Sequence, residues 1–242
     1  MNFSIKGRLA LGAGLLCVGA LAIYVTMEPG RPQSVSTPAA HISWPDFAAT
    51  KAGAEAGDAR AQALFAKMHA EGHGTPRDYA AAARLYRLAA AQGHADGQHG
   101  LAELCEAGQG VPLDYAAAAQ WYRRAAEQGH VSAQFGLAVM YEFGRGVAKD
   151  QAEAALWYRR AAEQGEAQAQ YNLGQRCSLA LGVAADPVEA YKWFRLAAAQ
   201  GLPDAAKAGD AMRTRLSREE FAEARRRVDS FTPSGRAAFS GK

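Results

Sequence analysis

The feature that most constrains the fold of this chain is a glycine that returns every 36 residues. No insertion or deletion separates its five occurrences, which are Gly57, Gly93, Gly129, Gly165 and Gly201. A fixed period of this length is the signature of a solenoid, in which each repeat packs only against its neighbours. The spacing therefore predicts four stacked repeats over residues 57–92, 93–128, 129–164 and 165–200.

Each repeat is predicted to form two helices. In the third repeat, Ala133, Leu137 and Tyr141 recur at intervals of four and so share one helical stripe. Gly144 then ends that helix, because glycine adopts the left-handed conformation of helix ends. Asp150 is placed to cap the next helix through its carboxylate. The apolar face of that second helix consists of Ala154, Trp157, Tyr158, Ala161 and Ala162.

Composition agrees with an all-α architecture. Apolar residues make up 49% of the chain and charged residues 21%, which is enough for a buried core. Alanine is the best helix former, and as a small side chain at the packing positions it lets helix axes approach closely. The predicted fold class is an all-α solenoid of antiparallel helix pairs, four 36-residue repeats with a cap at each end.

The third repeat carries a motif that can be compared with known families. It reads AQFGLAVMYEFGRGVAKDQAEAALWYRRAAEQG from Ala133 to Gly165. This pattern resembles the Sel-one-like repeat family, relatives of the tetratricopeptide repeats, and it recurs four times in register over about residues 57–201. The resemblance implies a right-handed superhelix of antiparallel helix pairs. It also implies an adaptor or scaffold role, often in bacterial envelopes or secretory pathways.

The sequences on either side of the repeats predict capping helices. Residues 44–56 resemble a lone second helix before the first repeat, and residues 201–231 supply two helices after the last one. Ser217 and Glu220 form a capping box that opens the final helix. Residues 232–242 are expected to fray.

The amino-terminal residues predict a membrane segment. Residues 9–27 form a run of 19 uncharged positions, which at about 1.5 Å per residue matches a bilayer core. Lys6 and Arg8 favour a cytoplasmic stub over residues 1–8, and residues 28–43, rich in Pro, Ser and Thr, predict a disordered linker. The run is long for a cleaved signal peptide, which favours an uncut transmembrane signal anchor. That interpretation predicts a single-pass protein of the bacterial inner membrane with its C-terminal domain in the periplasm.

Chemical motifs for catalysis or metal binding are missing from the sequence. His69 and His73 are four residues apart but have no acidic or cysteine partner at metal-site spacing. Cys105 and Cys177 occupy the same position two repeats apart, roughly 20 Å, whereas a disulfide needs Cα atoms within about 7 Å. No nucleophile motif, phosphate loop or dinucleotide fingerprint is complete. We expect no catalytic residue, metal, disulfide, cofactor or small-molecule substrate.

The charges argue against a nucleic-acid partner. Lys and Arg number 27 against 24 Asp and Glu, a net charge of +3, whereas nucleic-acid binding needs a strongly positive face. Arginine pairs on the second helices are followed by glutamates that are placed to pair with them: Arg123, Arg124 and Glu127, and Arg159, Arg160 and Glu163. We interpret these arginines as part of a solvated helix face.

The first helices carry the predicted binding site. Their faces opposite the packing stripe differ between repeats, and solenoids of this class present such faces on a concave surface. Aromatic side chains and acids in its central part predict a peptide or protein segment with basic and apolar character. The predicted site residues are Asp96, His99, Glu103, Glu106, Ser132, Phe135, Val139, Glu142, Gln168, Tyr171 and Gln175.

The sequence alone leaves three functions open. The favoured one is a membrane-tethered scaffold with a protein or peptide partner, in contact with the lipid bilayer through residues 9–27. Cleavage of that segment would instead leave a soluble secreted or periplasmic effector or inhibitor, and the length of the mature chain separates the two. The third is an enzyme with an unrecognised site, which a cluster of perturbed titratable groups would favour.

Overall fold

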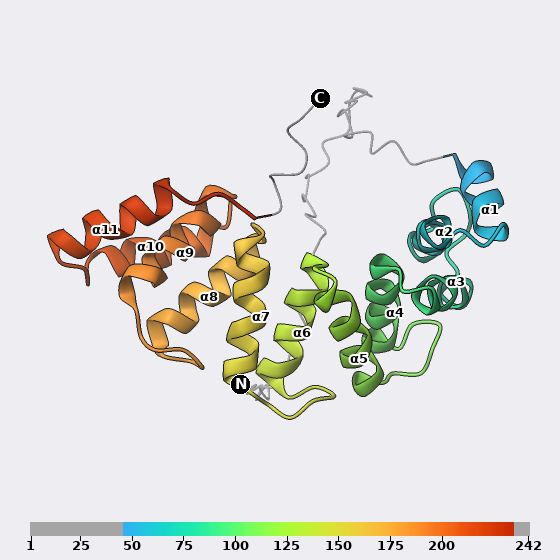
Figure 1. The fold of residues 1–242 in the computed structure, drawn as a ribbon, viewed down its shortest axis with the longest axis horizontal. Helices are drawn as coiled ribbons and strands as arrows, with labels where there is room; N and C mark the ends of the chain where they lie inside the picture. The colour runs from blue at the N-terminus through green and yellow to red at the C-terminus, as the bar shows by residue number, and fades with distance from the viewer. Residues whose placement is uncertain (1–45, 235–242) are drawn as a thin grey trace, which may run out of the picture. The chain divides into compact units, whose positions relative to one another are not determined.

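The computed structural model describes residues 46–234, and these residues form eleven α-helices and no strand (Figure 1). All eleven helices belong to one compact unit. In chain order they are α1 (Phe47–Glu55), α2 (Ala59–Glu71), α3 (Tyr79–Ala91), α4 (Ala95–Ala107), α5 (Tyr115–Glu127), α6 (Val131–Phe143), α7 (Gln151–Glu163), α8 (Ala167–Leu179), α9 (Pro187–Ala199), α10 (Pro203–Arg213) and α11 (Arg218–Asp229).

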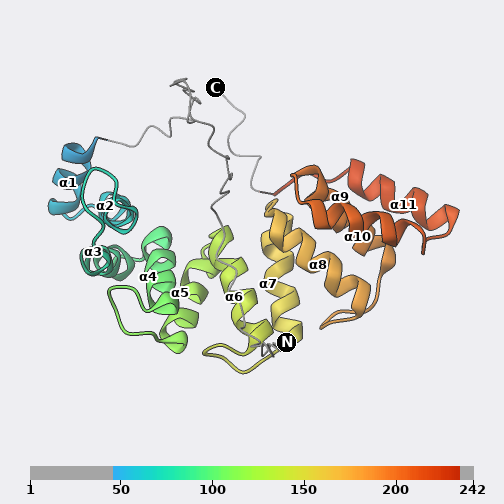
Figure 2. The same cartoon turned by 180° about the vertical axis from the view of Figure 1, so that it is seen from behind.

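The helices pair as the period predicts. Within the four repeats α2 packs on α3, α4 on α5, α6 on α7 and α8 on α9, and each second helix also contacts the first helix of the next repeat. Figures 1 and 2 show these pairs following one another in chain order. Helix α1 packs on α2, while α10 and α11 both pack on α9. The predicted all-helical repeat architecture is confirmed over the described residues.

Repeated side chains start and stop the helices. The carboxylate of Asp150 accepts hydrogen bonds from the backbone N–H groups of Ala152 and Glu153 at 2.8 and 3.0 Å, as predicted for a cap. Aspartates one period away cap the other second helices, namely Asp78, Asp114 and Asp186. The predicted capping box of Ser217 and Glu220 opens α11.

Small residues make room for the core. In each second helix a fully buried alanine meets the neighbouring helices, at Ala82, Ala118, Ala154 and Ala190. Gly100 of α4 lies directly against the ring of Tyr86, and Gly136 of α6 lies against the ring of Tyr122, so a Cβ atom at either glycine would overlap the ring. The helices therefore approach closely around one buried aromatic side chain in each repeat.

A buried glutamine in each first helix links three successive helices. In the third repeat, Gln134 Nε2 donates to the carbonyl of Ala126 on α5 at 3.2 Å, and Gln164 at the end of α7 donates to Gln134 Oε1 at 2.7 Å. The same side-chain pair recurs in the other repeats, as Gln62 with Gln92, Gln98 with Gln128, and Gln170 with Gln200. These bonds satisfy polar groups that would otherwise be buried without a partner.

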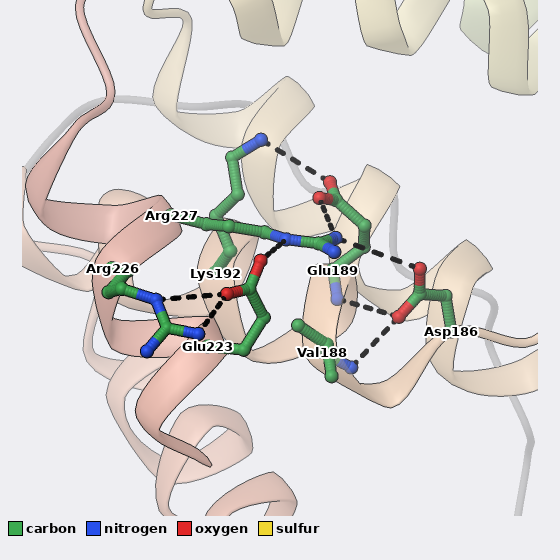
Figure 3. Close-up of polar contacts among 7 residues, drawn as sticks. All are labelled: Asp186, Val188, Glu189, Lys192, Glu223, Arg226 and Arg227. Carbon is green, nitrogen blue, oxygen red and sulfur yellow. Dashed lines mark hydrogen bonds and ion pairs between the residues drawn. The ribbon is translucent and has the colours of Figure 1, made fainter. Parts of the chain in front are cut away.

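The carboxyl-terminal helix is fastened to α9 by charged side chains (Figure 3). Arg227 of α11 reaches Glu189 of α9 at 2.7 Å and Glu223 of its own helix at 2.8 Å. Beyond α11, the backbone N–H of Ser234 donates to the carbonyl of Glu163 at 2.9 Å. The first residues of the segment expected to fray, residues 232–234, are thus held against α7.

The predicted amino-terminal features lie outside the described residues. They are the stub, the membrane span and the linker, over residues 1–8, 9–27 and 28–43. Between residues 46 and 234, none of the helices has the length and apolar character that crossing a bilayer requires.

Candidate functional site

The first helices surround a hollow of about 770 Å³ at the amino-terminal end of the repeats. Its walls come from α2 and α4 and from the start of α6. Four of the predicted site residues lie together there, namely Asp96, His99, Glu103 and Ser132. Further lining comes from residues that the sequence analysis did not single out for this site, among them Tyr79, Tyr86 and His130.

Two histidine rings form part of this lining. The rings of His99 and His130 stack with centroids 4.4 Å apart, and His130 Nε2 lies 3.2 Å from an Asp96 carboxylate oxygen. His130 Nδ1 accepts a hydrogen bond from the backbone N–H of Ala133, which caps α6 and leaves the ring proton on Nε2. Burial, followed by the charge of His130, lowers the pKa of His99 to about 4. Burial also lowers the pKa of His130, so both rings are neutral at pH 7.

The two long walls of the hollow differ in charge. Helix α2 contributes two cations, Arg60 and Lys67, and one acid, Glu71, which lies 3.8 Å from Lys67. Helix α4 contributes Asp96 and Glu103, seven residues apart on one face. Desolvation and then the nearby Glu106 raise the pKa of Glu103. A cationic group brought to the α4 wall would relieve that repulsion.

Two predicted acids are engaged inside the helix pairs. Tyr122 donates its hydroxyl to Glu106 at 2.9 Å, and Tyr158 donates its hydroxyl to Glu142 at 2.6 Å. Glu142 also pairs at 3.0 Å with Arg176, whose side chain is only 2% exposed. Glu106 and Glu142 therefore hold neighbouring helices together.

Arg176 was missed by the sequence analysis although a signal was present. It occupies a core position that is apolar in the other three repeats, where Met68, Leu104 and Met140 stand. A single charged residue in an otherwise apolar column of a repeat alignment indicates a buried ion pair. Here its partner Glu142 comes from the preceding repeat.

The predicted aromatic anchors are half-buried. Phe135 packs on Tyr158 and Tyr171 packs on Phe194, each with ring centroids 5.7 Å apart, and Val139 also packs against the core. Gln168 and Gln175 are exposed on α8. These five residues continue the face of Asp96 and His99 beyond the hollow, with only part of each aromatic ring available to a partner.

A second, smaller hollow of about 210 Å³ lies at the other end of this face. It is formed by α8, α9 and α10, and it includes Gln175 from the predicted site together with Phe194 and Met212. Leu179 at its edge is 63% exposed. The first-helix face thus has a charged hollow at one end and an apolar hollow at the other.

A known repeat family shares this architecture. The Sel1 repeat family model matches residues 59–94, 95–130, 131–166 and 167–202, more than half of the chain. The chain belongs to the Sel1 repeat family. Sel1 repeat proteins are generally protein-interaction scaffolds.

Solved Sel1 structures share the fold over much of this chain. A Sel1 repeat protein from Oxalobacter formigenes is 33% identical, with a TM-score of 0.62 over 66% of this chain and 47% of that one. A protective antigen from uropathogenic Escherichia coli strains, with an SLR fold, is 27% identical, with a TM-score of 0.51 over 76% of this chain and 48% of that one. This chain therefore spans about half the length of each. No curated protein matches it.

The arginines on the second helices of the Sel1 repeats make different contacts from the predicted ion pairs. Among the described residues, neither Glu127 nor Glu163 forms an ion pair, so the predicted pairing with the arginines is wrong. Arg124 instead lies over the ring of Trp121 at 4.4 Å, and the same arrangement recurs one repeat later at 4.3 Å, with Arg160 over Trp157. A surface ion pair contributes little, and a guanidinium group stacked on an indole ring gains a comparable or larger attraction.

Proposed function

We propose that this Sel1 repeat chain is a membrane-tethered interaction scaffold that binds a segment of a partner polypeptide along its first helices. Shifted pKa values at His99 and Glu103 are the kind of feature that would favour an enzyme, but burial is the main cause of both shifts, and we therefore propose that the chain is not an enzyme. The observation that carries the proposal is the 770 Å³ hollow. It is built from positions that differ between repeats, whereas the packing positions around it hardly change. A surface that varies on a constant framework is suited to recognising one partner.

The charges of the walls indicate the chemistry of that partner. Asp96 and Glu103 favour a basic side chain against α4, because a cation there would offset the charge of Asp96 and stabilise the ionised form of Glu103, whose pKa burial raises to about 7. The apolar hollow at α8 and α10 favours an apolar side chain further along the same segment. The partner segment is therefore expected to be basic at one end and apolar at the other.

The proposal includes the tether and the cell compartment. Residues 9–27 would span the bacterial inner membrane once and place the repeats in the periplasm, wound as a right-handed superhelix. Support comes from the 19-residue uncharged run and from the two basic residues before it.

Substitutions in the hollow test the binding site. The double variant Asp96→Asn, Glu103→Gln keeps the side-chain shapes and removes the acidic wall, so capture of the partner should weaken at least about tenfold. The matched control is Gln120→Ala, Glu127→Ala, two exposed residues on the other side of the helix pairs. Partner capture is quantified by mass spectrometry with each variant in its native cells. Equal recovery with both double variants would refute the proposed site.

A further inference from the structure

The two sides of the helix pairs carry different charged residues. Exposed residues of α3, α5 and α7, together with the partly buried Arg159, recur at spacings of three, four and seven and form one stripe on each helix. We call these twelve residues the outer stripe: Arg84, Arg87, Leu88 and Ala91 on α3, Gln120, Arg123, Arg124 and Glu127 on α5, and Leu156, Arg159, Arg160 and Glu163 on α7. Six arginines stand against two glutamates here, whereas α4, on the side of the hollow, has three acids and no lysine or arginine.

The six arginines of the outer stripe make contacts other than ion pairs. Within residues 46–234 none of them forms an ion pair with a carboxylate. Arg124 and Arg160 lie flat on tryptophan rings, and Arg123 donates to the Tyr141 hydroxyl. In α9, by contrast, Lys192 pairs with Glu189 and Arg195 pairs with Asp210. The outer stripe is thus a row of six arginines without ion pairs, which outnumber the two glutamates in the same stripe.

Apolar side chains are interleaved with these cations. Leu88 is 52% exposed and Leu156 is 42% exposed, and Trp121 is partly exposed beside Arg124. Arginine, tryptophan and leucine on one face are the residues with which proteins enter the boundary between lipid headgroups and acyl chains. A nucleic acid fits less well, because the exposed side chains of Leu88 and Leu156 would gain nothing from its phosphate backbone.

We propose that the outer stripe lies on the anionic headgroup surface of a lipid bilayer. Its arginines would contact the phosphate groups of anionic lipids, and Leu88 and Leu156 would enter the upper acyl region. The hollow on the first helices would then face away from the bilayer and remain open to a partner. This inference rests on the membrane tether of the proposed function, which would hold the stripe near such a surface.

Vesicle flotation tests the stripe without the tether. The protein from Ser43 to Lys242 is a compact unit with its own core and a helical cap at each end. We expect it to float with vesicles of phosphatidylcholine mixed with phosphatidylglycerol, to bind pure phosphatidylcholine at least about tenfold less, and to be released by salt. Absence of any preference for the anionic vesicles would overturn the inference.

Two charge-matched triple variants locate the contact. Arg87→Glu, Arg124→Glu, Arg160→Glu should lower flotation at least about tenfold, whereas Arg77→Glu, Lys149→Glu, Arg218→Glu, which reverse exposed charges outside the stripe, should leave it near the level of the unaltered protein. Circular dichroism checks that both remain folded. Equal losses from the two variants, or binding to double-stranded DNA as tight as to the anionic vesicles, would contradict a specific bilayer face.

These experiments can refute the binding site in the hollow and the bilayer face independently of each other. The outer-stripe variant leaves Asp96 and Glu103 untouched, so its capture of the polypeptide partner should be unchanged. If the hollow variant still captures the partner while flotation is normal, the binding site is refuted and the bilayer face stands. If flotation fails while hollow variants lose the partner, only the bilayer face is refuted.

Discussion

At the scale of single residues, the buried pair of Glu142 and Arg176 shows how a repeat protein departs from its own pattern. An arginine replaces an apolar side chain in the core and is tolerated because a carboxylate from the neighbouring repeat lies 3.0 Å away. Its guanidinium also donates to the Gln151 side chain at 2.8 Å. Removing one partner leaves a charge without compensation, which costs more than the pair contributes.

This asymmetry gives a stability prediction. Glu142→Gln should lower the free energy of unfolding by about 3 kcal/mol, because the buried guanidinium loses its counterion. Arg176→Met, which restores the residue type of two other repeats, should cost clearly less. Glu163→Gln, at an exposed glutamate without an ion pair, serves as control and should change stability by less than about 0.5 kcal/mol. Urea unfolding measures all three, and equal costs for the first two would contradict a buried pair of this kind.

Gly146 illustrates a close approach of backbones between repeats. Its φ of +68° is in the left-handed region, and a Cβ atom there would overlap the carbonyl group of Tyr115 at the start of α5. Gly129 has a similar φ of +88° but no atom near its missing Cβ. Gly129→Ala should therefore cost only the backbone strain, about 1 kcal/mol. Gly146→Ala should cost at least about 1 kcal/mol more in urea unfolding, and equal costs would show that the loop can move aside.

The stacked histidines predict a loss of stability in acid. His99 has a pKa of about 4 in the folded protein against 6.5 for an ordinary histidine, so unfolding takes up a proton between these values. Stability from this group is complete above about pH 6.5 and declines as the pH falls toward 4, by up to about 3 kcal/mol. Other groups near it are Asp96 and Glu103 on α4, Lys67 on α2 and His130.

A histidine variant isolates that contribution. His99→Gln should lose less stability than the unaltered protein between pH 6.5 and 4, in thermal unfolding measured across this range. His73→Gln, at a loop histidine away from the stack, is the control. A parallel pH dependence in the unaltered protein and in His99→Gln would show that His99 does not titrate as its surroundings indicate.

At the scale of elements, the repeating features could be predicted and the exceptions could not. The aspartate caps, the helix-breaking glycines and the alanine stripes recur at one period, so a single sequence displays them four times. Arg176 occurs in one repeat, and the histidine at the start of α6, His130, has a counterpart in His94 that makes no side-chain cap hydrogen bond. The roles of His130 and Arg176 depend on side chains brought from another helix. The stacking of Arg124 on Trp121 was also missed. In a helix Arg124 can reach both Trp121, three residues before it, and Glu127, three residues after it, so the spacing alone does not decide between a cation–π contact and an ion pair.

The ion pair between Arg227 and Glu189 is predicted to hold α11 on α9 at the carboxyl-terminal end of the repeats. Arg227→Ala removes the ion pair to Glu189, so the amides of α11 should exchange about fivefold to tenfold faster with deuterium. Arg226→Ala is the matched control, because Arg226 pairs only with Glu223 within α11. Similar exchange in both variants would show that apolar packing alone holds α11 on α9.

At the scale of the whole molecule, a constant framework carries two different faces. The first helices have a charged hollow and an apolar hollow, and the second helices have a row of arginines. The period predicts the framework but not these faces, because a binding surface is made of the positions that do not repeat. Of the predicted site, Asp96, His99, Glu103 and Ser132 lie in one hollow, whereas Glu106 and Glu142 hold helices together.

The most direct test of the account is site-specific photo-crosslinking in intact cells. A photoreactive amino acid is placed at Glu103 or Ser132 in the hollow, or at Gln120 on the outer stripe, one position at a time. The account predicts that both hollow positions crosslink the same polypeptide and that Gln120 does not. Crosslinking of that polypeptide from Gln120 alone, or no protein crosslink from either hollow position, would contradict it.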